Sequence, residues 1–255
     1  MSRYASDGRH DGWLRISAYL ALVIGLVAAL ALTASAAELG SPMANRTSSS
    51  VDLPDPTRVE AASLGEALAR RRSVRAFAGQ ALLLAEVATL LWAAQGRTGP
   101  EGLRTAPSAG ALFPLEIYLA VGSVEGLAPG IYRYVSGRHR LDQVAVGDAR
   151  RALARAALDQ SWIADAPVIL IIAAVPSRTA AKYGDRSARY IAMEAGHVGQ
   201  NVYLQAVALG LGTTVVGAFD DGRVKDAAKL ASDHEPFALY PVGHPKTAAG
   251  GAAPR

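Results

Sequence analysis

The longest regular pattern of apolar and polar positions in the chain runs from Lys182 to Phe219. Its apolar residues recur at steps of three or four, which is the period of a buried helix face. They are Ala188, Ile191, Ala195, Val198, Val202, Ala206 and Leu209. Gly210 and Gly212 follow, as glycine commonly does beyond the end of a helix, and Val215 and Val216 then suit a strand. The pattern predicts a long core helix, a glycine stop and a short buried strand.

This helix has two interpretations. Gly196 and Gly199 fall inside it, where each costs about 1 kcal/mol relative to alanine. Such glycines permit close approach of a second helix or a flat ligand. Polar residues also gather at both helix ends, namely Lys182, Tyr183, Arg186, Arg189, His197, Gln200 and Asn201. The alternative is a helix that only builds the core.

Shorter patterns on either side predict further helices and strands. A capping box at Ser63 to Glu66 starts one helix, and the apolar face from Leu84 to Gln95, with Gly96 as its stop, predicts a second. The continuous apolar run from Ala166 to Val175 predicts a central strand buried on both faces. The other predicted elements are strands at 115–121, 130–135, 139–141 and 235–243, a helix at 148–158 and a long loop at 97–114. Together they favour an α+β or α/β layered fold, with a central mixed sheet flanked by helices.

The two ends of the chain differ from this folded part. Residues 1–37 contain an apolar run from Ile16 to Ala34, preceded by scattered arginines, and Ala34-Ser35-Ala36 fits a secretory cleavage site. An uncleaved inner-membrane anchor is the alternative, because about 20 apolar residues can span a bilayer. We therefore expect an exported protein, periplasmic or secreted, with residues 1–37 as signal peptide or anchor. The composition of residues 38–62 is that of a linker, and residues 247–255 form a low-complexity tail.

Composition narrows the classes of function. The formal charge of +4 is spread along the chain, with no basic block longer than Arg70 to Arg72, so no nucleic-acid footprint is expected. The chain has no cysteine, which excludes disulfides, thiol catalysis and cysteine-ligated metals. The five histidines are far apart in the sequence, so we expect no metal site.

Three short stretches carry candidate chemistry. Arg71-Arg72-Ser73 ends the first helix, and guanidinium and hydroxyl groups grip phosphate; the alternative is arginines that only pair with the helix dipole. The small residues from Ala106 to Ala111 let backbone N–H groups approach a flat ligand or an anion. Lys182-Tyr183 can supply a general base and acid, or can be a solvated helix entry.

Other motif assignments are weaker. Ser108 as a hydrolase nucleophile lacks the G-x-S-x-G elbow, since Ala106 occupies the first glycine position. Gly210 and Gly212 lie after a helix rather than before one, and Val215 stands at the third glycine position of a dinucleotide fingerprint. The chain therefore matches neither a Rossmann nor a P-loop protein.

Taken together, these stretches resemble a known family. The chain from about Ser63 to Lys246 is similar to the nitroreductase-like flavoproteins, and among them to the SagB-type branch, which includes azoline oxidases of thiazole/oxazole peptide biosynthesis. The matching runs are RRSVRAF (71–77), LLWAAQG (90–96), RTAPSAGALFPLEIYL (104–119), GIYRY (130–134), ALDQSWIADAP (157–167), KYGDRSARYIAMEAGHVGQNVYLQAVALGLG (182–212) and YPVGHP (240–245). The resemblance implies a nitroreductase-like fold in an obligate-type homodimer, with non-covalent FMN at each dimer interface.

The resemblance also implies roles for single residues. The FMN phosphate and ribityl oxygens would be held by Arg71, Arg72 and Ser73, and a second phosphate contact would remain with Lys246. The isoalloxazine would be lined, from the other subunit, by Pro107, Ser108, Ala109, Gly110 and Ala111. A ring carbonyl edge would meet Gln160, and a backbone N–H near flavin N5 would come from Val215, Val216 or Gly217. The catalytic pair would be Lys182 and Tyr183.

The implied activity is that of an FMN-dependent oxidoreductase. It would use ping-pong hydride transfer through flavin N5, to or from a small electrophilic or azoline-like substrate, with NAD(P)H or another electron donor. Two departures motivate an alternative: Val215-Val216-Gly217-Ala218 replaces the Pro-x-Glu-Gly of well-known nitroreductases, and the C-terminal basic pair is reduced to Lys246. The alternative is a catalytically reduced flavin-binding or scaffold protein of the cell envelope.

Overall fold

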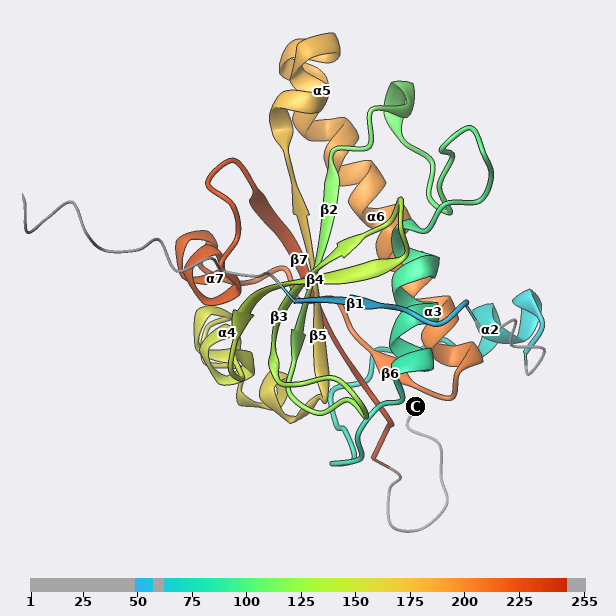
Figure 1. The fold of residues 1–255 in the computed structure, drawn as a ribbon, viewed down its shortest axis with the longest axis vertical. Helices are drawn as coiled ribbons and strands as arrows, with labels where there is room; N and C mark the ends of the chain where they lie inside the picture. Colours follow the sequence, from blue (N-terminus) through green and yellow to red (C-terminus); the bar gives the residue numbers. More distant parts are fainter. Residues whose placement is uncertain (1–48, 57–61, 247–255) are drawn as a thin grey trace, which may run out of the picture. The chain divides into compact units, whose positions relative to one another are not determined.

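The computed structural model describes residues 49–56 and 62–246, which all belong to one unit, Ser48–Arg255. Its centre is a seven-stranded sheet with strand order β1-β4-β3-β2-β5-β7-β6 (Figure 1). The strands are β1 (Ser50–Asp52), β2 (Leu115–Val121), β3 (Gly130–Val135), β4 (Arg140–Val146), β5 (Val168–Ala174), β6 (Gly212–Thr213) and β7 (Glu235–Gly243). The fold is therefore α+β, as the sequence predicted.

The sheet is antiparallel, and the expectation of a mixed sheet was wrong. Every ladder between neighbouring strands is antiparallel. Within residues 49–56 and 62–246, parallel pairing occurs only in isolated bridges, between Ser73 and Thr213 and between Leu82 and Val124. The reason is that β2, β3 and β4 follow one another through short turns, which join antiparallel neighbours.

Helices cover both faces of the sheet. The helices are α2 (Leu64–Arg70), α3 (Leu84–Gln95), α4 (Arg150–Ala156), α5 (Pro176–Tyr183), α6 (Ser187–Ala208) and α7 (Asp221–Ala228). Three short 3₁₀ turns are η1 (Ala109–Ala111), η2 (Ser161–Asp165) and η3 (Gly184–Arg186). Side chains of α3 and α6 pack on one face and those of α4, η2 and α7 on the other. Figure 1 shows α3 and α6 on one side of the sheet and α4 and α7 on the other.

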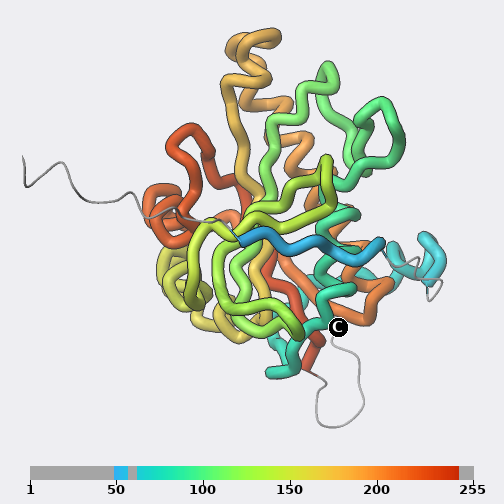
Figure 2. The backbone as a smooth tube through the Cα atoms, viewed as in Figure 1, coloured from blue at the N-terminus to red at the C-terminus, as the bar shows by residue number. Residues whose placement is uncertain are grey.

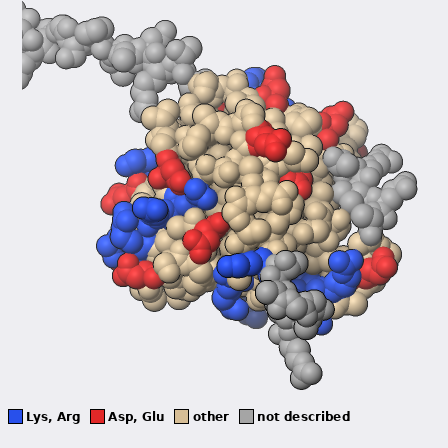
Figure 3. Space-filling model, turned by 90° about the horizontal axis from the view of Figure 1, so that it is seen from below, with Lys and Arg blue, Asp and Glu red and all other residues tan. Residues whose placement is uncertain are grey.

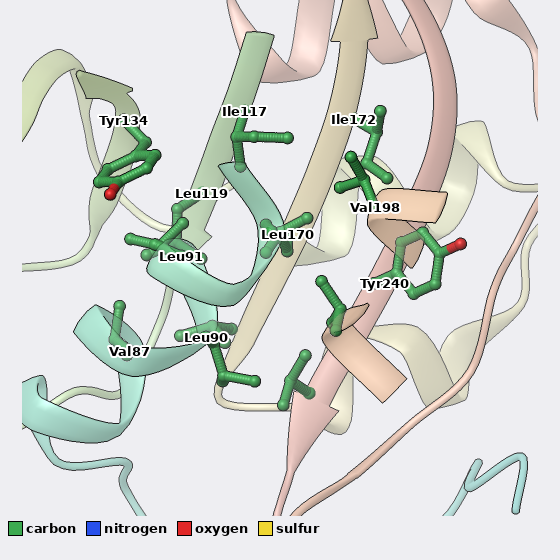
Figure 4. Packing of buried hydrophobic residues seen from close by; sticks show 14 of the residues in the cluster. Val87, Leu90, Leu91, Ile117, Leu119, Tyr134, Leu170, Ile172, Val198 and Tyr240 are labelled. Carbon is green, nitrogen blue, oxygen red and sulfur yellow. The ribbon is translucent and has the colours of Figure 1, made fainter. Parts of the chain in front are cut away.

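The core is continuous through β5, whose residues are all buried. Leu170 and Ile172 face α3 and α6, where they share a core cluster with Leu90 and Leu91 of α3 and Val198 of α6 (Figure 4). Ile169 and Ile171, which alternate with them along the strand, face α4 and α7. A strand sandwiched in this way needs apolar residues on both faces, so the prediction of a central strand buried on both sides is confirmed.

Most elements occupy the predicted positions. Ser63 forms the capping box, since its backbone N–H donates to Glu66 Oε2 at 2.8 Å and its hydroxyl accepts from the Glu66 N–H at 3.3 Å. The α3 helix and the strands β2, β3 and β7 have the predicted bounds. The return strand β4 is longer than expected, and α4 is shorter.

Four elements differ from the expectation. The prediction of a strand at Val215–Val216 was wrong. The strand β6 is Gly212–Thr213, and Val216 forms an isolated bridge with Leu239. Helices α5 and α7 were not predicted, and β1 lies inside the expected linker 38–62. Three residues that pair at a sheet edge leave little periodicity in a sequence, so β1 could not be recognised from pattern alone.

The expected signal or anchor at 1–37 and the tail at 247–255 lie outside the described residues, as does most of the linker. Among helices of the described residues, none has the length and apolar character to cross a bilayer.

Candidate active site

The segment Arg71–Ser73 lies beside β6, at one end of the sheet. Ser73 bridges Thr213, and the Val74 N–H donates to the Thr213 carbonyl at 3.0 Å. Farther along, Phe77 bridges Pro245 and the Lys246 N–H donates to the Ala76 carbonyl at 2.9 Å. Figure 2 shows this segment running next to the C-terminal end of β7. The fold thus brings Lys246 close to the predicted phosphate-binding segment.

Tyr203 of α6 connects these parts, and the sequence analysis missed it. Its hydroxyl accepts a hydrogen bond of 2.8 Å from the Val215 N–H, donates to Thr214 Oγ1 at 3.3 Å and lies 3.4 Å from Ser73 Oγ. Burial alone would raise the pKa of Tyr203, but its hydrogen bonds with Ser73, Thr214 and Val215 and the charge of Arg71 outweigh burial and lower the pKa. The available signal was a tyrosine on the buried face of a helix, whose hydroxyl needs a partner.

The two neighbouring arginines have different positions. The Arg71 guanidinium carbon lies 5.2 Å from the centre of the Tyr203 ring. Arg72 instead folds back on α2, where its Nη1 donates to the carbonyls of Ala69 at 2.9 Å and Arg71 at 2.8 Å. Arg72 therefore satisfies carbonyl groups at the helix end, as in the alternative interpretation of this motif, while Arg71 stands with Ser73.

The three residues of the loop after β6 that were expected near a flavin ring differ in their backbone N–H groups. The Val215 N–H is committed to Tyr203 and the Val216 N–H to the Leu239 carbonyl at 2.8 Å. Gly217 is exposed, and no described contact uses its N–H. Of the three residues expected near a flavin ring, Gly217 is therefore the candidate donor.

Gln160 lies close to the same end of the sheet. The Asp220 N–H donates to the Ala156 carbonyl at 2.9 Å, which holds the loop after β6 against the end of α4. Gln160 follows that helix, and its own Nε2 donates to the Ala157 carbonyl at 2.9 Å.

Seen from this end of the molecule, Lys and Arg side chains form several separate groups with Asp and Glu between them (Figure 3).

The second predicted group, residues 107–111, lies near the other end of α6, where Figure 1 shows the loop beside α5. Gly110, Ala111 and Phe113 all have positive φ, at 62°, 54° and 45°. Two of these residues carry a side chain, for which left-handed backbone costs about 1–2 kcal/mol each. A loop of this shape needs contacts that hold it.

Several side chains supply those contacts. Ser108 Oγ donates to Glu194 Oε2 at 2.5 Å and accepts from the Phe113 N–H at 2.9 Å. Arg178 Nη1 donates to the Phe113 carbonyl at 3.1 Å, and the Arg104 guanidinium lies 4.5 Å from the Phe113 ring centre. The Ser108 hydroxyl thus faces a carboxylate and not an imidazole, which removes the support for a hydrolase nucleophile.

Lys182 and Tyr183 lie at the end of α5, not at the start of the long helix as expected, and both touch this loop. A Cβ placed on Gly110 would come within 2.8 Å of the Tyr183 hydroxyl and 3.0 Å of Lys182 Nζ. Lys182 is exposed, and the Tyr183 ring packs edge-on against Tyr190 at 4.9 Å. The glycine therefore allows the loop to lie directly against the predicted catalytic pair.

One chain does not unite the two groups of predicted residues. Tyr190 marks the Lys182 end of α6, and Tyr203 marks the Ser73 end. At a rise of about 1.5 Å per residue they are about 20 Å apart along the helix. A ligand that touches both groups must therefore lie along α6 or between two copies of the chain.

The sequence is similar to known proteins over most of its length. Residues 68–244 match the family model described as the nitroreductase family. The chain belongs to the nitroreductase family. A Methanocaldococcus jannaschii protein named as a nitroreductase is 46% identical over 193 residues, which cover 76% of this chain and 95% of that protein.

Two further similar proteins are matched over a smaller share of their length. A nitroreductase structure from Anabaena variabilis superposes with a TM-score of 0.70 at 29% identity. It covers 78% of this chain, which spans only 42% of the length of that protein. The trifolitoxin-processing protein TfxB of Rhizobium leguminosarum bv. trifolii is 32% identical over 119 residues, 45% of this chain and 32% of TfxB.

Proposed function

We propose that this member of the nitroreductase family is an FMN-dependent oxidoreductase that works as a homodimer by a ping-pong reaction. The observation that carries the proposal is the position of two candidate half-sites at opposite ends of α6. Arg71, Ser73 and Gly217 lie at one end. Lys182, Tyr183 and the 107–111 loop lie at the other. Each half-site has groups that the other lacks.

A second copy in antiparallel orientation would complete both sites at once. A twofold axis across α6 places the Ser73 end of one helix beside the Lys182 end of the other, and the same contact repeats by symmetry. The exposed face of α6 suits such pairing, because Ala192, Gly196 and His197 are exposed there and Met193 is 55% exposed. Small residues allow two helices to approach closely.

The residues present fit FMN. A phosphate dianion is matched by the guanidinium of Arg71 and the hydroxyl of Ser73, with Lys246 held nearby through its backbone bond to Ala76. The Gly217 N–H is available for a ring edge, and the small residues at 109–111 leave room for a flat ring. When bound, the flavin would supply the hydride chemistry at its N5 position, with NAD(P)H or another compound as electron donor.

The side chains of the protein would hold and transfer protons and would exclude water around the substrate. Lys182 and Tyr183 border the loop at the half-site that lacks phosphate-binding groups, where a lysine can hold or accept a proton and a phenol can donate one. The partial similarity to a trifolitoxin-processing protein supports the SagB-type branch. It therefore favours an azoline-like or other small electrophilic substrate.

The second candidate is a flavin-binding or scaffold protein of the cell envelope with reduced turnover. It is supported by Val215-Val216-Gly217-Ala218 where a glutamate is usual, and by a single C-terminal base, Lys246. In this structure the N–H groups of Val215 and Val216 are used internally, so one backbone donor would have to serve the ring.

A visible spectrum of the purified protein tests the proposal. We expect flavin absorbance, or its appearance with saturable binding when FMN is added, and a dimeric mass in solution. Bound flavin that is reduced by NADH or NADPH, or by light, should then be reoxidised by 1,4-benzoquinone. A protein that stays colourless with FMN would contradict both candidates, and bound flavin that no acceptor reoxidises would favour the scaffold.

We further propose that the chain is exported, periplasmic or secreted, with an inner-membrane anchor as the alternative. The support is the apolar run from Ile16 to Ala34 and the small residues after it.

A further inference from the structure

A buried carboxyl group lies directly behind the strained loop. Glu194 of α6 is 2% exposed, yet its two oxygens both have partners from other elements. Oε2 accepts from Ser108 Oγ at 2.5 Å and Oε1 from Gln95 Nε2 at 3.4 Å. An acidic side chain is almost never this deeply buried unless it is paired, and the sequence analysis gave Glu194 no role.

The hydrogen bonds around Glu194 form a chain with a defined direction. Arg104 Nη1 donates to Gln95 Oε1 at 2.8 Å, so the Gln95 amide must turn its Nε2 toward Glu194. At the other end, the Phe113 N–H donates to Ser108 Oγ, whose proton points at Glu194. Every group in this chain donates toward Glu194. Only an acceptor on both oxygens, the ionised carboxylate, satisfies both neighbours.

We propose that Glu194 is the positioning residue that holds the loop 108–113 against Lys182 and Tyr183. It acts through Ser108, because that hydroxyl joins the two ends of the loop segment in which Gly110, Ala111 and Phe113 have positive φ. Gly110 then lies against the Tyr183 hydroxyl and Lys182 Nζ. This role rests on the proposed function in one respect, namely that the Lys182–Tyr183 half-site is where the substrate reacts.

Polar and charged groups on α3, on the loop 104–108 and on α6 bear on the titration of Glu194. Burial raises the pKa of Glu194, while Ser108, Gln95, the Arg104 guanidinium and His197 counteract that effect. Because the pKa in the folded state is above the unfolded value, the contribution of Glu194 to stability is greatest at low pH. That contribution is lost as pH rises through the folded pKa.

Replacement of Glu194 by glutamine cannot satisfy both neighbours. If the amide oxygen accepts from Ser108, the Nε2 group faces Gln95 Nε2, and two donors oppose each other. If the amide is turned round, the Ser108 proton loses its acceptor. The double variant Gln95→Glu with Glu194→Gln removes this conflict. Its carboxylate, now on α3, would accept from Arg104 and from the new amide on α6, whose oxygen would accept from Ser108.

The test compares Glu194→Gln, the double variant and wild type, with Glu235→Gln as the matched control. Glu235 is paired with Lys225 at 2.9 Å and takes no part in the loop. The first measurement is hydrogen exchange at residues 108–113 without flavin. We expect exchange in Glu194→Gln to be faster than in wild type by about tenfold or more. Exchange in the double variant and in the control Glu235→Gln should match wild type. The melting temperature of Glu194→Gln should change little, because the removal of a buried charge offsets the unsatisfied hydrogen-bonding group.

The second measurement uses FMN-loaded, photoreduced protein mixed with 1,4-benzoquinone at a series of pH values. In wild type, the rate of flavin reoxidation should fall toward low pH as Glu194 becomes protonated. Glu194→Gln should be slower by about tenfold or more, because displacement of reacting groups by about 1 Å costs up to 10²-fold. The double variant should recover, with its acid limb moved to lower pH by the adjacent Arg104.

Unchanged exchange and unchanged rate in Glu194→Gln would overturn the inference, and so would a double variant no better than the single one. If Glu194→Gln does not fold, Ser108→Ala tests the same link, since it removes the hydroxyl that donates to Glu194 and accepts from the Phe113 N–H. A wild-type loop and rate in Ser108→Ala would also refute the inference. A wild-type protein that binds no FMN would refute the proposed function, while the exchange measurement would still decide the role of Glu194 in the loop.

Discussion

The Tyr203 hydroxyl accepts a hydrogen bond of 2.8 Å from the backbone N–H of Val215. Twelve positions apart in sequence, these two residues join the long helix to the loop that follows β6. The same hydroxyl lies 3.4 Å from Ser73 Oγ. One phenol therefore sets the distance between the candidate phosphate-binding segment and the candidate ring-contacting loop.

Replacing Tyr203 with phenylalanine should lower both stability and flavin affinity. The partly buried Val215 N–H would lose its acceptor, which costs about 1–3 kcal/mol, and Ser73 would lose its neighbour. Thermal unfolding and FMN titration measure the two effects. Tyr240→Phe is the control, because Tyr240 packs edge-on against the Tyr203 ring at 5.9 Å without touching Ser73. Equal losses in both variants would contradict the assigned role.

Arg71 and Arg72 should respond differently to alanine. Loss of Arg71, which stands beside Ser73, should weaken FMN binding by about 1.5–3 kcal/mol, the range for a charged hydrogen bond. Loss of Arg72, which is folded onto the α2 carbonyls, should weaken it much less. FMN titrations of the two variants form a matched pair, and a larger loss for Arg72→Ala would reverse the assignment.

Gly110→Ala should reduce turnover more than stability. The new Cβ would meet the ends of two side chains, Tyr183 and Lys182, which can move aside, and the φ of 62° would add about 1–2 kcal/mol of strain. We expect a modest fall in melting temperature and a large fall in the rate of flavin reoxidation by benzoquinone. Gly137→Ala, with open space around its Cβ, is the control. A rate equal to wild type would show that this contact is not used in the reaction.

His234 should make stability depend on pH. It is 5% exposed, and its Nδ1 lies 2.8 Å from the Tyr118 hydroxyl. Burial, the largest effect, lowers the pKa of His234, against the opposing charges of Glu116 and Asp233. The unfolded chain therefore binds the proton first, and this part of the stability is complete above the unfolded value of about 6.5 and is lost as pH falls below it. Unfolding free energies across that range should fall less steeply in His234→Gln, and an identical slope would contradict the assignment.

The exported form should lack its first residues. Removal of residues 1–37 would leave Glu38 as the N-terminus, and the intact mass of protein isolated from the producing cells would show it. An unprocessed Met1, with the protein in the membrane fraction, would favour the anchor instead.

Local order in the sequence was enough to predict much of the fold. The capping box at Ser63, the periodicity of α3 and α6 and the apolar run of β5 each depend on neighbours within a few residues, so the elements follow from pattern. The resemblance of several runs to the nitroreductase family was confirmed by the family match. The segments Arg71–Ser73 and 107–111 and the pair Lys182–Tyr183 were identified as candidates in the same way.

Contacts between distant residues could not be predicted in this way. Several contacts depend on how α6 crosses the sheet. Arg72 caps a helix while Arg71 stands over Tyr203. Val215 donates to Tyr203 rather than to a strand, and Glu194 accepts from Ser108. A side chain's partner is set by packing between elements far apart in the chain, and hydropathy periodicity carries no record of it. For the same reason, only the folded chain shows that the two candidate half-sites lie at opposite ends of one helix.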